Sequence, residues 1–249
     1  MTAANRATNE IGRVREIVRY PVKSMAGVPA ESAFLGWHGL AGDRRFAFRR
    51  LGNDTGFPWL SATRVFEMLL YQPVGLDETS GQPLPTHVRT PAGRELELRS
   101  DELQREIAEL FGGGVELLQH RHGIFDDAPI SVISATTIAA IGDGAEMELD
   151  RRRFRANILL ETGGEPFLED AWVGGTLVFG DDDPAPAVRV TMLDSRCKMI
   201  DLDPDTAARD ERVRESVKRL NKNNAGVYGT VVRTGTIRVG DPVRLVQEP

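Results

Sequence analysis

Short apolar stretches of strand length outnumber helical patterns along this chain, and the two kinds do not alternate. A doubly wound parallel sheet needs strands and helices in regular alternation, so this order argues against such a fold. It favours a mainly β protein of the barrel type with a few helices attached. The predicted strands are residues 11–20, 30–35, 44–50, 157–161, 176–179, 188–194, 227–232 and 243–246.

Three further segments have the apolar spacing of amphipathic helices. Ser100 stands directly before the first of them and Ser134 begins the second, and a serine side chain can cap the first turn of a helix. Glycines end helices readily, so residues 112–114 and Gly142 are the predicted stops. The first helix and its glycine tail form the predicted seam between two halves of the chain. The predicted helices are residues 101–111, 134–141 and 211–220.

The charge balance excludes some classes of partner. The chain has 31 Lys and Arg against 37 Asp and Glu, a formal net charge of −6. This acidic balance argues against nucleic-acid binding as the main function, although one local basic pocket is compatible with it. No stretch reaches the roughly 20 apolar residues of a membrane span, and the first ten residues lack the apolar core of a signal peptide. We therefore expect a cytoplasmic protein without a nucleic-acid or membrane partner.

The chain has a single cysteine, Cys197. It therefore has no intrachain disulfide, no structural zinc site built on several cysteines and no four-cysteine iron–sulfur cluster. Arg196 and Lys198 flank the thiol, and nearby cations favour the nucleophilic, metal-binding thiolate. The alternative is an inert buried cysteine. The polar, aspartate-rich sequence that follows favours the reactive interpretation.

Three other segments concentrate basic and polar residues after a strand or a glycine-rich turn. The planar fork of arginine suits phosphate and carboxylate oxygens, although a solvated loop with surface ion pairs is the commoner role of such segments. Phosphate-binding Walker loops, dinucleotide-binding glycine motifs, zinc-protease motifs and serine-hydrolase elbows are absent from the sequence. The three segments are residues 20–24 (YPVKS), 39–45 (GLAGDRR) and 150–157 (DRRRFRAN).

Taken in chain order, the segments YPVKS, GLAGDRRF, RFRAN, DSRCKMIDLDPDT and GTIRVGDPVRLV resemble the MOSC family, named for the molybdenum cofactor sulfurase C-terminal domain. The resemblance extends from about residue 11 to residue 246. Within the family, the chain is most similar to the mitochondrial amidoxime-reducing component and to bacterial relatives that reduce N-hydroxylated compounds. The resemblance implies a MOSC N-terminal β-barrel domain at residues 11–118 and a MOSC β-barrel domain at residues 119–249, with a cofactor in the cleft between them.

The resemblance also implies a molybdenum cofactor, that is, molybdenum bound to molybdopterin. Cys197 matches the position that ligates the metal, so it is the implied metal ligand and catalytic residue. Basic side chains and hydroxyls suit the phosphate of this cofactor, an amide suits the pterin edge, and sulfur suits the soft metal. The implied cofactor-binding residues are Lys23, Ser24, Arg44, Ser134, Thr137, Arg155, Asn157, Ser195 and Arg196.

The implied activity is reduction of a small N-hydroxylated substrate, of the amidoxime or hydroxylamine type, by abstraction of its oxygen at the metal. Electrons would come from a separate donor protein such as a ferredoxin, a cytochrome b5-like protein or a flavin reductase. Asp194, Asp201 and Asp203 are candidate acid–base residues because they lie close to Cys197 in the sequence. Two alternatives stay open: a sulfur or cofactor carrier with a persulfide on Cys197, and a β-barrel binding module without activity.

Overall fold

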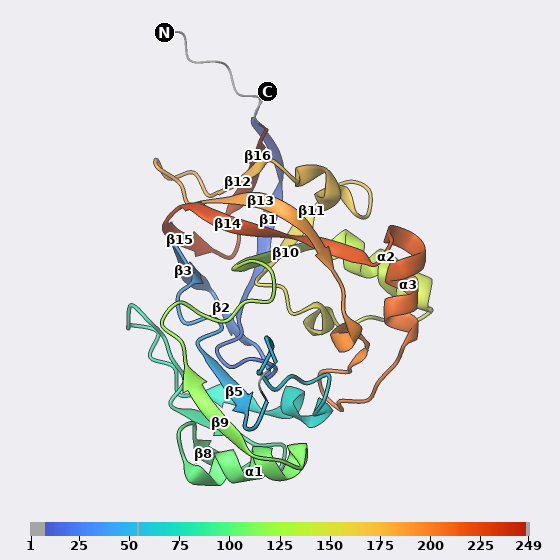
Figure 1. Cartoon of the computed structure of the whole chain (residues 1–249). Coiled ribbons are helices and arrows are strands. Elements are labelled where there is room, and N and C mark those ends of the chain that lie inside the picture. Colours follow the sequence, from blue (N-terminus) through green and yellow to red (C-terminus); the bar gives the residue numbers. More distant parts are fainter. Residues whose placement is uncertain (1–7, 54, 248–249) are drawn as a thin grey trace.

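The computed structural model describes residues 8–53 and 55–247, and its centre is a closed β-barrel of seven strands (Figure 1). In order around the barrel, these strands are β11 (Ile158–Thr162), β10 (Ile130–Ser134), β14 (Asn224–Arg233), β13 (Ala187–Ser195), β12 (Thr176–Phe179), β16 (Pro242–Val246) and β1 (Thr8–Arg19). β1 pairs with β16 on one side and with β11 on the other, which closes the sheet. The predicted mainly β barrel fold is confirmed.

The close approach of β1 to β11 depends on a glycine. Gly12 pairs with Thr162, and a Cβ atom at residue 12 would lie 2.2 Å from the carbonyl oxygen of Glu161. Only glycine lacks that atom, so β1 can lie against β11 at this point without a steric clash. The barrel interior is filled by large apolar side chains from its strands and from a short 3-10 helix, η3 (Leu168–Trp172), which contributes the buried Trp172. This packing gives the barrel a core of its own.

Smaller sheets cover one end of the barrel and continue into a second lobe (Figure 1). A second apolar core lies beneath the barrel, where Phe46, Phe48, Leu103 and Ile107 are buried together with Leu202 from the C-terminal half. Both halves of the sequence therefore share this core. The elements around this second core and the remaining small strands are β2 (Val28–Ala30), β3 (Ser32–Gly36), β4 (Gly39–Leu40), β5 (Phe46–Arg50), η1 (Phe66–Leu70), β6 (Gln72–Val74), β7 (His87–Arg89), β8 (Glu95–Glu97), α1 (Asp101–Phe111), β9 (Val115–Gln119) and β15 (Gly235–Arg238).

Two helices pack against each other on the side of the barrel, α2 (Ala135–Ala145) and α3 (Arg212–Asn221) (Figure 1). The predicted serine caps of α1 and α2 are confirmed, because Ser100 and Ser134 each accept a hydrogen bond from the backbone N–H three residues later. The prediction that α2 ends at Gly142 is wrong. The helix continues to Ala145, and Glu146 in a left-handed conformation ends it.

The predicted boundary at residue 118 separates two sequence segments whose strands are interleaved. β1, from the first segment, closes a barrel whose other strands all lie beyond residue 118. β15, from the second segment, pairs with β3 from the first. The division into domains at residues 11–118 and 119–249 stays a prediction. Among the described residues, no helix is both long and apolar enough to cross a bilayer.

Candidate functional site

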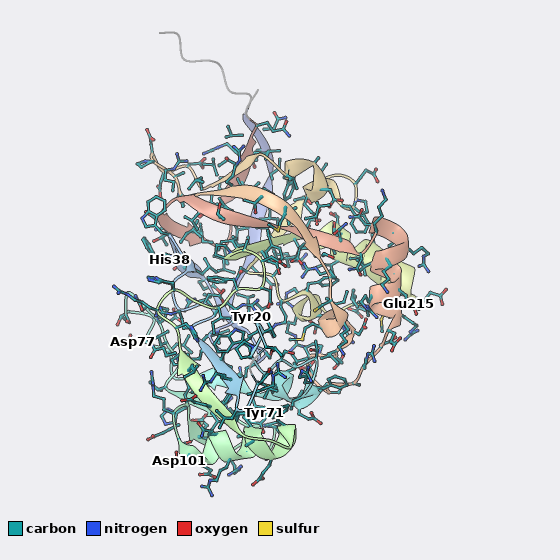
Figure 2. All side chains as sticks on the ribbon, in the orientation of Figure 1. Tyr20, His38, Tyr71, Asp77, Asp101 and Glu215 are labelled. Carbon is teal, nitrogen blue, oxygen red and sulfur yellow. The ribbon has the colours of Figure 1, made fainter. Side chains whose placement is uncertain are left out.

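Tyr20, at the end of β1, is the centre of a cationic cluster between the barrel and the second lobe (Figure 2). The guanidinium of Arg155 lies 4.3 Å from the Tyr20 ring centroid, and that of Arg44 lies 5.2 Å from it. Lys23 follows in the next turn, where its backbone N–H donates to the Phe46 carbonyl. The fold thus brings Arg155 to two basic side chains that precede it by more than 100 residues.

Backbone conformation positions these side chains. Ser24, Arg44 and Arg155 all have left-handed backbones, with φ of 68°, 51° and 51°. This conformation is uncommon for residues other than glycine, and clusters of it occur where a site demands a particular side-chain direction. The Arg44 turn is also held by its backbone N–H, which donates to the Tyr20 carbonyl at 3.0 Å.

A buried carboxylate and amide support the cluster from behind. Asp43 accepts hydrogen bonds from the Tyr20 backbone N–H at 2.5 Å and from Asn157 Nδ2 at 3.1 Å, and it also forms an ion pair with Arg44 Nε at 3.8 Å. Burial raises the pKa of Asp43, while Arg44 opposes that shift. Asn157 also accepts a hydrogen bond from the Ser131 backbone. Its amide is therefore fully engaged in linking β1 to β10 and β11.

Lys23 is buried, with its side chain 4% exposed, and its ammonium donates to Asp126 Oδ1 at 2.7 Å. Burial lowers the pKa of Lys23, Asp126 opposes that shift, and Arg44 and Arg155 add to it. Conversely, Lys23, Arg44 and Arg155 together lower the pKa of Asp126 against the effect of its burial. Asp126 is thus the carboxylate that stands among the three cations.

Arg155 carries an unused donor. Its Nη1 donates to the Met25 carbonyl at 2.7 Å, whereas Nη2 is buried with no hydrogen-bond partner among the described residues. Burial and the neighbouring Arg44 lower the pKa of Arg155 to about 10. A buried donor without a partner costs free energy, so the cluster is suited to an anionic group that would accept from it.

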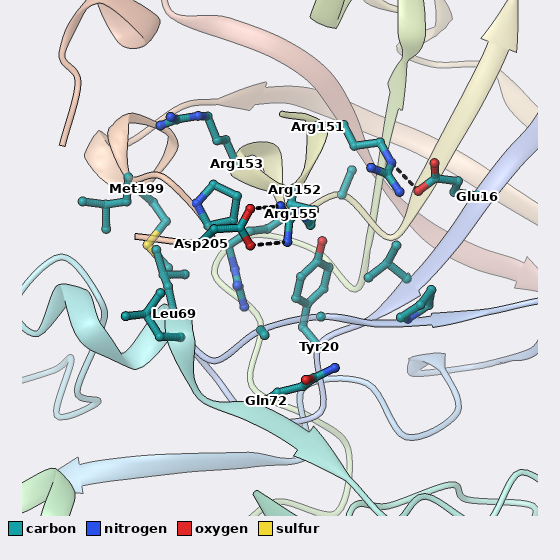
Figure 3. Close-up of a pocket in the computed structure, with 18 of the residues that line it drawn as sticks. Glu16, Tyr20, Leu69, Gln72, Arg151, Arg152, Arg153, Arg155, Met199 and Asp205 are labelled. Atoms are coloured by element: carbon teal, nitrogen blue, oxygen red, sulfur yellow. Dashed lines mark hydrogen bonds and ion pairs between the residues drawn. The ribbon is translucent and has the colours of Figure 1, made fainter. Parts of the chain in front are cut away.

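A cavity of about 620 Å³ opens beside this cluster and is lined by both Tyr20 and Arg155 (Figure 3). Its walls join apolar side chains from both lobes, such as Leu69 and Met199, with a row of arginines. On its walls, Arg151 forms an ion pair with Glu16, and Arg152 forms one with Asp205 (Figure 3). Its volume is in the range of cavities that take an organic ligand. Lys23, Arg44 and Cys197 are not among the described residues that line it.

Cys197 is exposed and lies between β13 and the short helix η4 (Lys198–Asp201). The neighbouring Arg196 points inward instead, and its guanidinium donates to the carbonyls of Ala225 at 2.7 Å and Phe154 at 2.8 Å. It also pairs with Asp194 at 2.8 Å. Arg196 therefore anchors the segment that presents the thiol, and its assignment as a cofactor contact stays a prediction.

Asp194 is a second buried carboxylate near the cluster, 2% exposed on its side chain. It accepts a hydrogen bond from Ser131 Oγ at 2.9 Å. Burial raises the pKa of Asp194 to about 6, and Arg196 opposes that shift. Burial, and next Asp194, raise the pKa of Tyr228. The sequence indicated Asp194 only by its distance from Cys197 along the chain.

Two of the implied hydroxyl contacts lie in another network. Ser134 Oγ donates to the buried carboxylate of Glu169 at 3.0 Å, and Thr137 Oγ1 accepts from the Phe167 backbone at 2.7 Å. Ser134 and Thr137 are both fully buried. Ser195 differs, being exposed at the end of β13, where its hydroxyl accepts from Asn223. The roles of these three residues stay predictions.

Sequence reasoning missed Asp126, Tyr20 and Tyr228 as parts of the site. Tyr20 stood inside a segment that was singled out, so its place before the rare lysine was an available signal. No sequence signal marked Asp126 or Tyr228 as part of the site, because only the fold brings residues 120–129 and β14 toward Lys23 and Arg44.

The sequence model of the MOSC domain matches residues 119–244, which is just over half of the chain. The chain belongs to the MOSC family. The matched region of this MOSC protein contains Arg155, Asn157 and Cys197, whereas Lys23 and Arg44 lie before it. The predicted family membership is therefore confirmed.

Relatives of the MOSC protein include proteins named mitochondrial amidoxime reducing component. Component 2 of Macaca fascicularis is 23% identical over 96% of this chain and 84% of its own length. Component 2 of Rattus norvegicus is 26% identical over 64% of this chain and 48% of its own length, so that match spans about half of the relative. Component 1 of Homo sapiens is 27% identical over 49% of this chain and 38% of its own length.

A solved structure has the same fold. The YUAD protein from Bacillus subtilis superposes with a TM-score of 0.53 at 14% sequence identity, covering 98% of this chain and 99% of that one. At that identity the likeness concerns the fold alone. It supports the barrel assignment independently of the sequence match.

Proposed function

We propose that this MOSC protein binds the molybdenum cofactor and reduces small N-hydroxylated compounds with electrons from a separate donor protein. The observation that carries the proposal is the cationic cluster around Tyr20, in which Arg155 holds an unpartnered buried donor. Such a cluster suits an anionic ligand group. The relatives named amidoxime reducing component supply the direction of the proposed reaction.

The residues present fit the chemistry of this cofactor. Lys23, Arg44 and Arg155 would hold its phosphate, and the hydroxyl of Ser24 lies next in the chain to Lys23. The cavity beside Arg155 has room for an organic ligand. Cys197 is the one cysteine of the chain, its thiol is exposed, and sulfur is the donor that soft metals prefer. When bound, the molybdenum centre would supply the two-electron redox chemistry that removes oxygen from an N–OH group.

Reduction of an N–OH group to N–H consumes two protons and two electrons and releases water, so the site needs a proton source. Asp194 is our candidate on the segment that carries the thiol. Its pKa of about 6 brings its protonation equilibrium close to neutral pH, so it can both take up and release a proton there, and Ser131 is a hydrogen-bonded neighbour through which it could exchange one. Arg196 fixes the orientation of this carboxylate.

The test is production of the protein in a host that makes molybdopterin. We expect stoichiometric molybdenum, pterin fluorescence after cofactor oxidation, and benzamidoxime reduction with an artificial electron donor. Candidate physiological donors, a ferredoxin, a cytochrome b5-like protein or a flavin reductase, can then be compared in the same assay. Protein that carries no molybdenum from such a host would overturn the proposal.

The exposure of Cys197 also favours a second function, transfer of sulfur or of the cofactor itself. An accessible thiol can carry a persulfide, which an inert buried cysteine could not exchange. Cyanide-releasable sulfur on Cys197 in protein without molybdenum would support this carrier function instead of the reductase.

A further inference from the structure

A hollow of about 460 Å³ lies beside the segment that carries the thiol. Lys198, the residue that follows Cys197, lines one side of it, and Phe111, the last residue of α1, lines another. Thr63 and Arg64 complete it from the turn that precedes η1. Both lobes therefore contribute to a depression that includes the residue directly after the exposed cysteine.

The charges of the two basic side chains in this hollow are not neutralised by a partner within the described part of the chain. Among the described residues, neither the Arg64 nor the Lys198 side chain has a hydrogen bond or an ion pair, and both are exposed. Many other arginines of the chain are paired, as Arg151 is with Glu16 and Arg152 with Asp205. In a protein with net charge −6, no described carboxylate pairs with either cation of this hollow, so both are available to an anionic ligand.

The remaining walls are mainly polar, and Phe111 is their one apolar residue among the described residues. Phe111 is only partly buried, so its ring is available as an apolar surface. Thr63 brings a hydroxyl that is held in place by Ser61 Oγ at 2.7 Å. A site with one aromatic face, one hydroxyl and two cations is complementary to a compact organic anion.

We propose that this hollow is a substrate subsite, in which Arg64 and Lys198 hold the carboxylate of an N-hydroxylated substrate that also carries an anionic group. The inference rests on the proposed reductase function and names its preferred substrate class. The alternative is an acidic protein partner, whose carboxylates could bind the same two cations. The recess between two lobes, with Phe111 in its wall, favours a small molecule over a flat protein surface.

The experiment compares neutral benzamidoxime with 4-carboxybenzamidoxime in the molybdenum-loaded enzyme, using a small artificial donor. The readout is the ratio of kcat/KM for the carboxylated substrate to kcat/KM for the neutral one, because effects common to both substrates cancel. Exposed ion pairs contribute little each, so we expect Arg64→Gln and Lys198→Gln each to lower the ratio about three- to fivefold. We expect the double variant to lower it about tenfold, and added salt to lower it in the wild type.

Matched controls separate charge from shape. Arg64→Lys keeps the charge and should keep most of the ratio, whereas Lys218→Gln removes an exposed lysine on α3 and should leave the ratio unchanged. Calorimetric titration with 4-carboxybenzamidoxime should show the same loss of affinity in both Gln variants.

Three results would overturn the inference. One is a ratio that Arg64→Gln and Lys198→Gln leave at the wild-type value. Another is a defect that appears only when a protein donor replaces the artificial one, which would assign the two cations to partner docking. If the wild type reduces neither substrate, the proposed function itself fails, and this inference fails with it.

Discussion

Lys23 Nζ donates to Asp126 Oδ1 at 2.7 Å, so a carboxylate of the protein itself stands where the cationic cluster would hold the anionic group of a ligand. Asp126 comes from an exposed segment, and its side chain is 49% exposed, whereas that of Lys23 is 4% exposed. An incoming phosphate must compete with this carboxylate for Lys23.

The first prediction concerns that competition. Asp126→Asn removes the negative charge while keeping the shape, so the cluster becomes more positive, and we expect inorganic phosphate to bind the cofactor-free protein several-fold more tightly. Calorimetric titration measures this. Asp127→Asn is the matched control, because Asp127 is also exposed and has no hydrogen bond or ion pair within the described part of the chain. Unchanged or weaker phosphate binding in Asp126→Asn would contradict the competition.

The second prediction concerns the thiol. Cys197→Ser should leave the melting temperature within about 2 °C of the wild type, since substitutions at exposed positions rarely change stability by more than about 0.5 kcal/mol. Because a hydroxyl is a poor ligand for a soft metal, molybdenum content and benzamidoxime turnover should fall below a tenth of the wild-type values. Metal analysis and thermal unfolding measure the two effects on the same preparation. Wild-type turnover in this variant would remove Cys197 from the site.

Local patterns were sufficient to predict much of the fold. Alternation and capping signals placed β12, β13, β16 and α1 within one or two residues, because these elements follow from their own sequences. β10 and β15 were missed, since the pairing of β10 with β11 and β14, and of β15 with β3, is a property of the whole barrel.

The site was predictable to the same extent. The segments that carry Lys23, Arg44 and Arg155 stood out in the sequence, and the fold brings both arginines to Tyr20 and Lys23 close to the two arginines. Their partners did not stand out. Asp126 is one of many acidic residues, and only the path of residues 120–129 brings it to Lys23. The same holds for Glu169 beneath Ser134.

The third prediction separates two roles of Ser134. The hydroxyl caps α2 and donates to the buried carboxylate of Glu169. Ser134→Ala removes both interactions, so the free energy of unfolding should fall by about 2 kcal/mol or more, from the lost cap and the unsatisfied carboxylate oxygen. Urea unfolding measures the loss. Ser195→Ala, at an exposed position, should change stability by less than about 0.5 kcal/mol. A stable Ser134→Ala protein that fails to retain molybdenum would instead support a cofactor contact.

The fourth prediction contrasts two buried arginines. Both arginines leave Nη2 without a hydrogen bond among the described residues. Arg155 lies beside other cations and donates to one carbonyl, whereas Arg196 forms an ion pair with Asp194 and donates to two carbonyls. Replacing a poorly compensated buried charge with an apolar side chain also removes its desolvation cost, whereas breaking a buried pair costs about 3–5 kcal/mol. We expect Arg155→Met to change the unfolding free energy of the cofactor-free protein by less than about 1 kcal/mol and to reduce molybdenum retention strongly. Arg196→Met should lose about 3 kcal/mol or more in the same urea titration. Equal losses in both variants would show that Arg155 is as fully compensated as Arg196.

The fifth prediction is a pH dependence of stability due to Asp194. Its pKa is raised to about 6 in the folded protein, against an unfolded value near 3.8. Below the unfolded pKa the group is protonated in both states and carries no penalty. As pH rises toward the folded pKa, the unfolded chain releases its proton while the folded protein retains it, so stability is lost across this window, by about 2–3 kcal/mol in total. Asp194→Asn lacks this titrating proton and does not lose stability in this way. The free energy of unfolding of the variant minus that of the wild type should therefore increase between about pH 4 and pH 6 and stay constant above pH 6. Urea unfolding at several pH values measures the difference, in which the titration of all other groups cancels. A constant difference across that range would mean that Asp194 is ionised throughout and that Arg196 outweighs its burial.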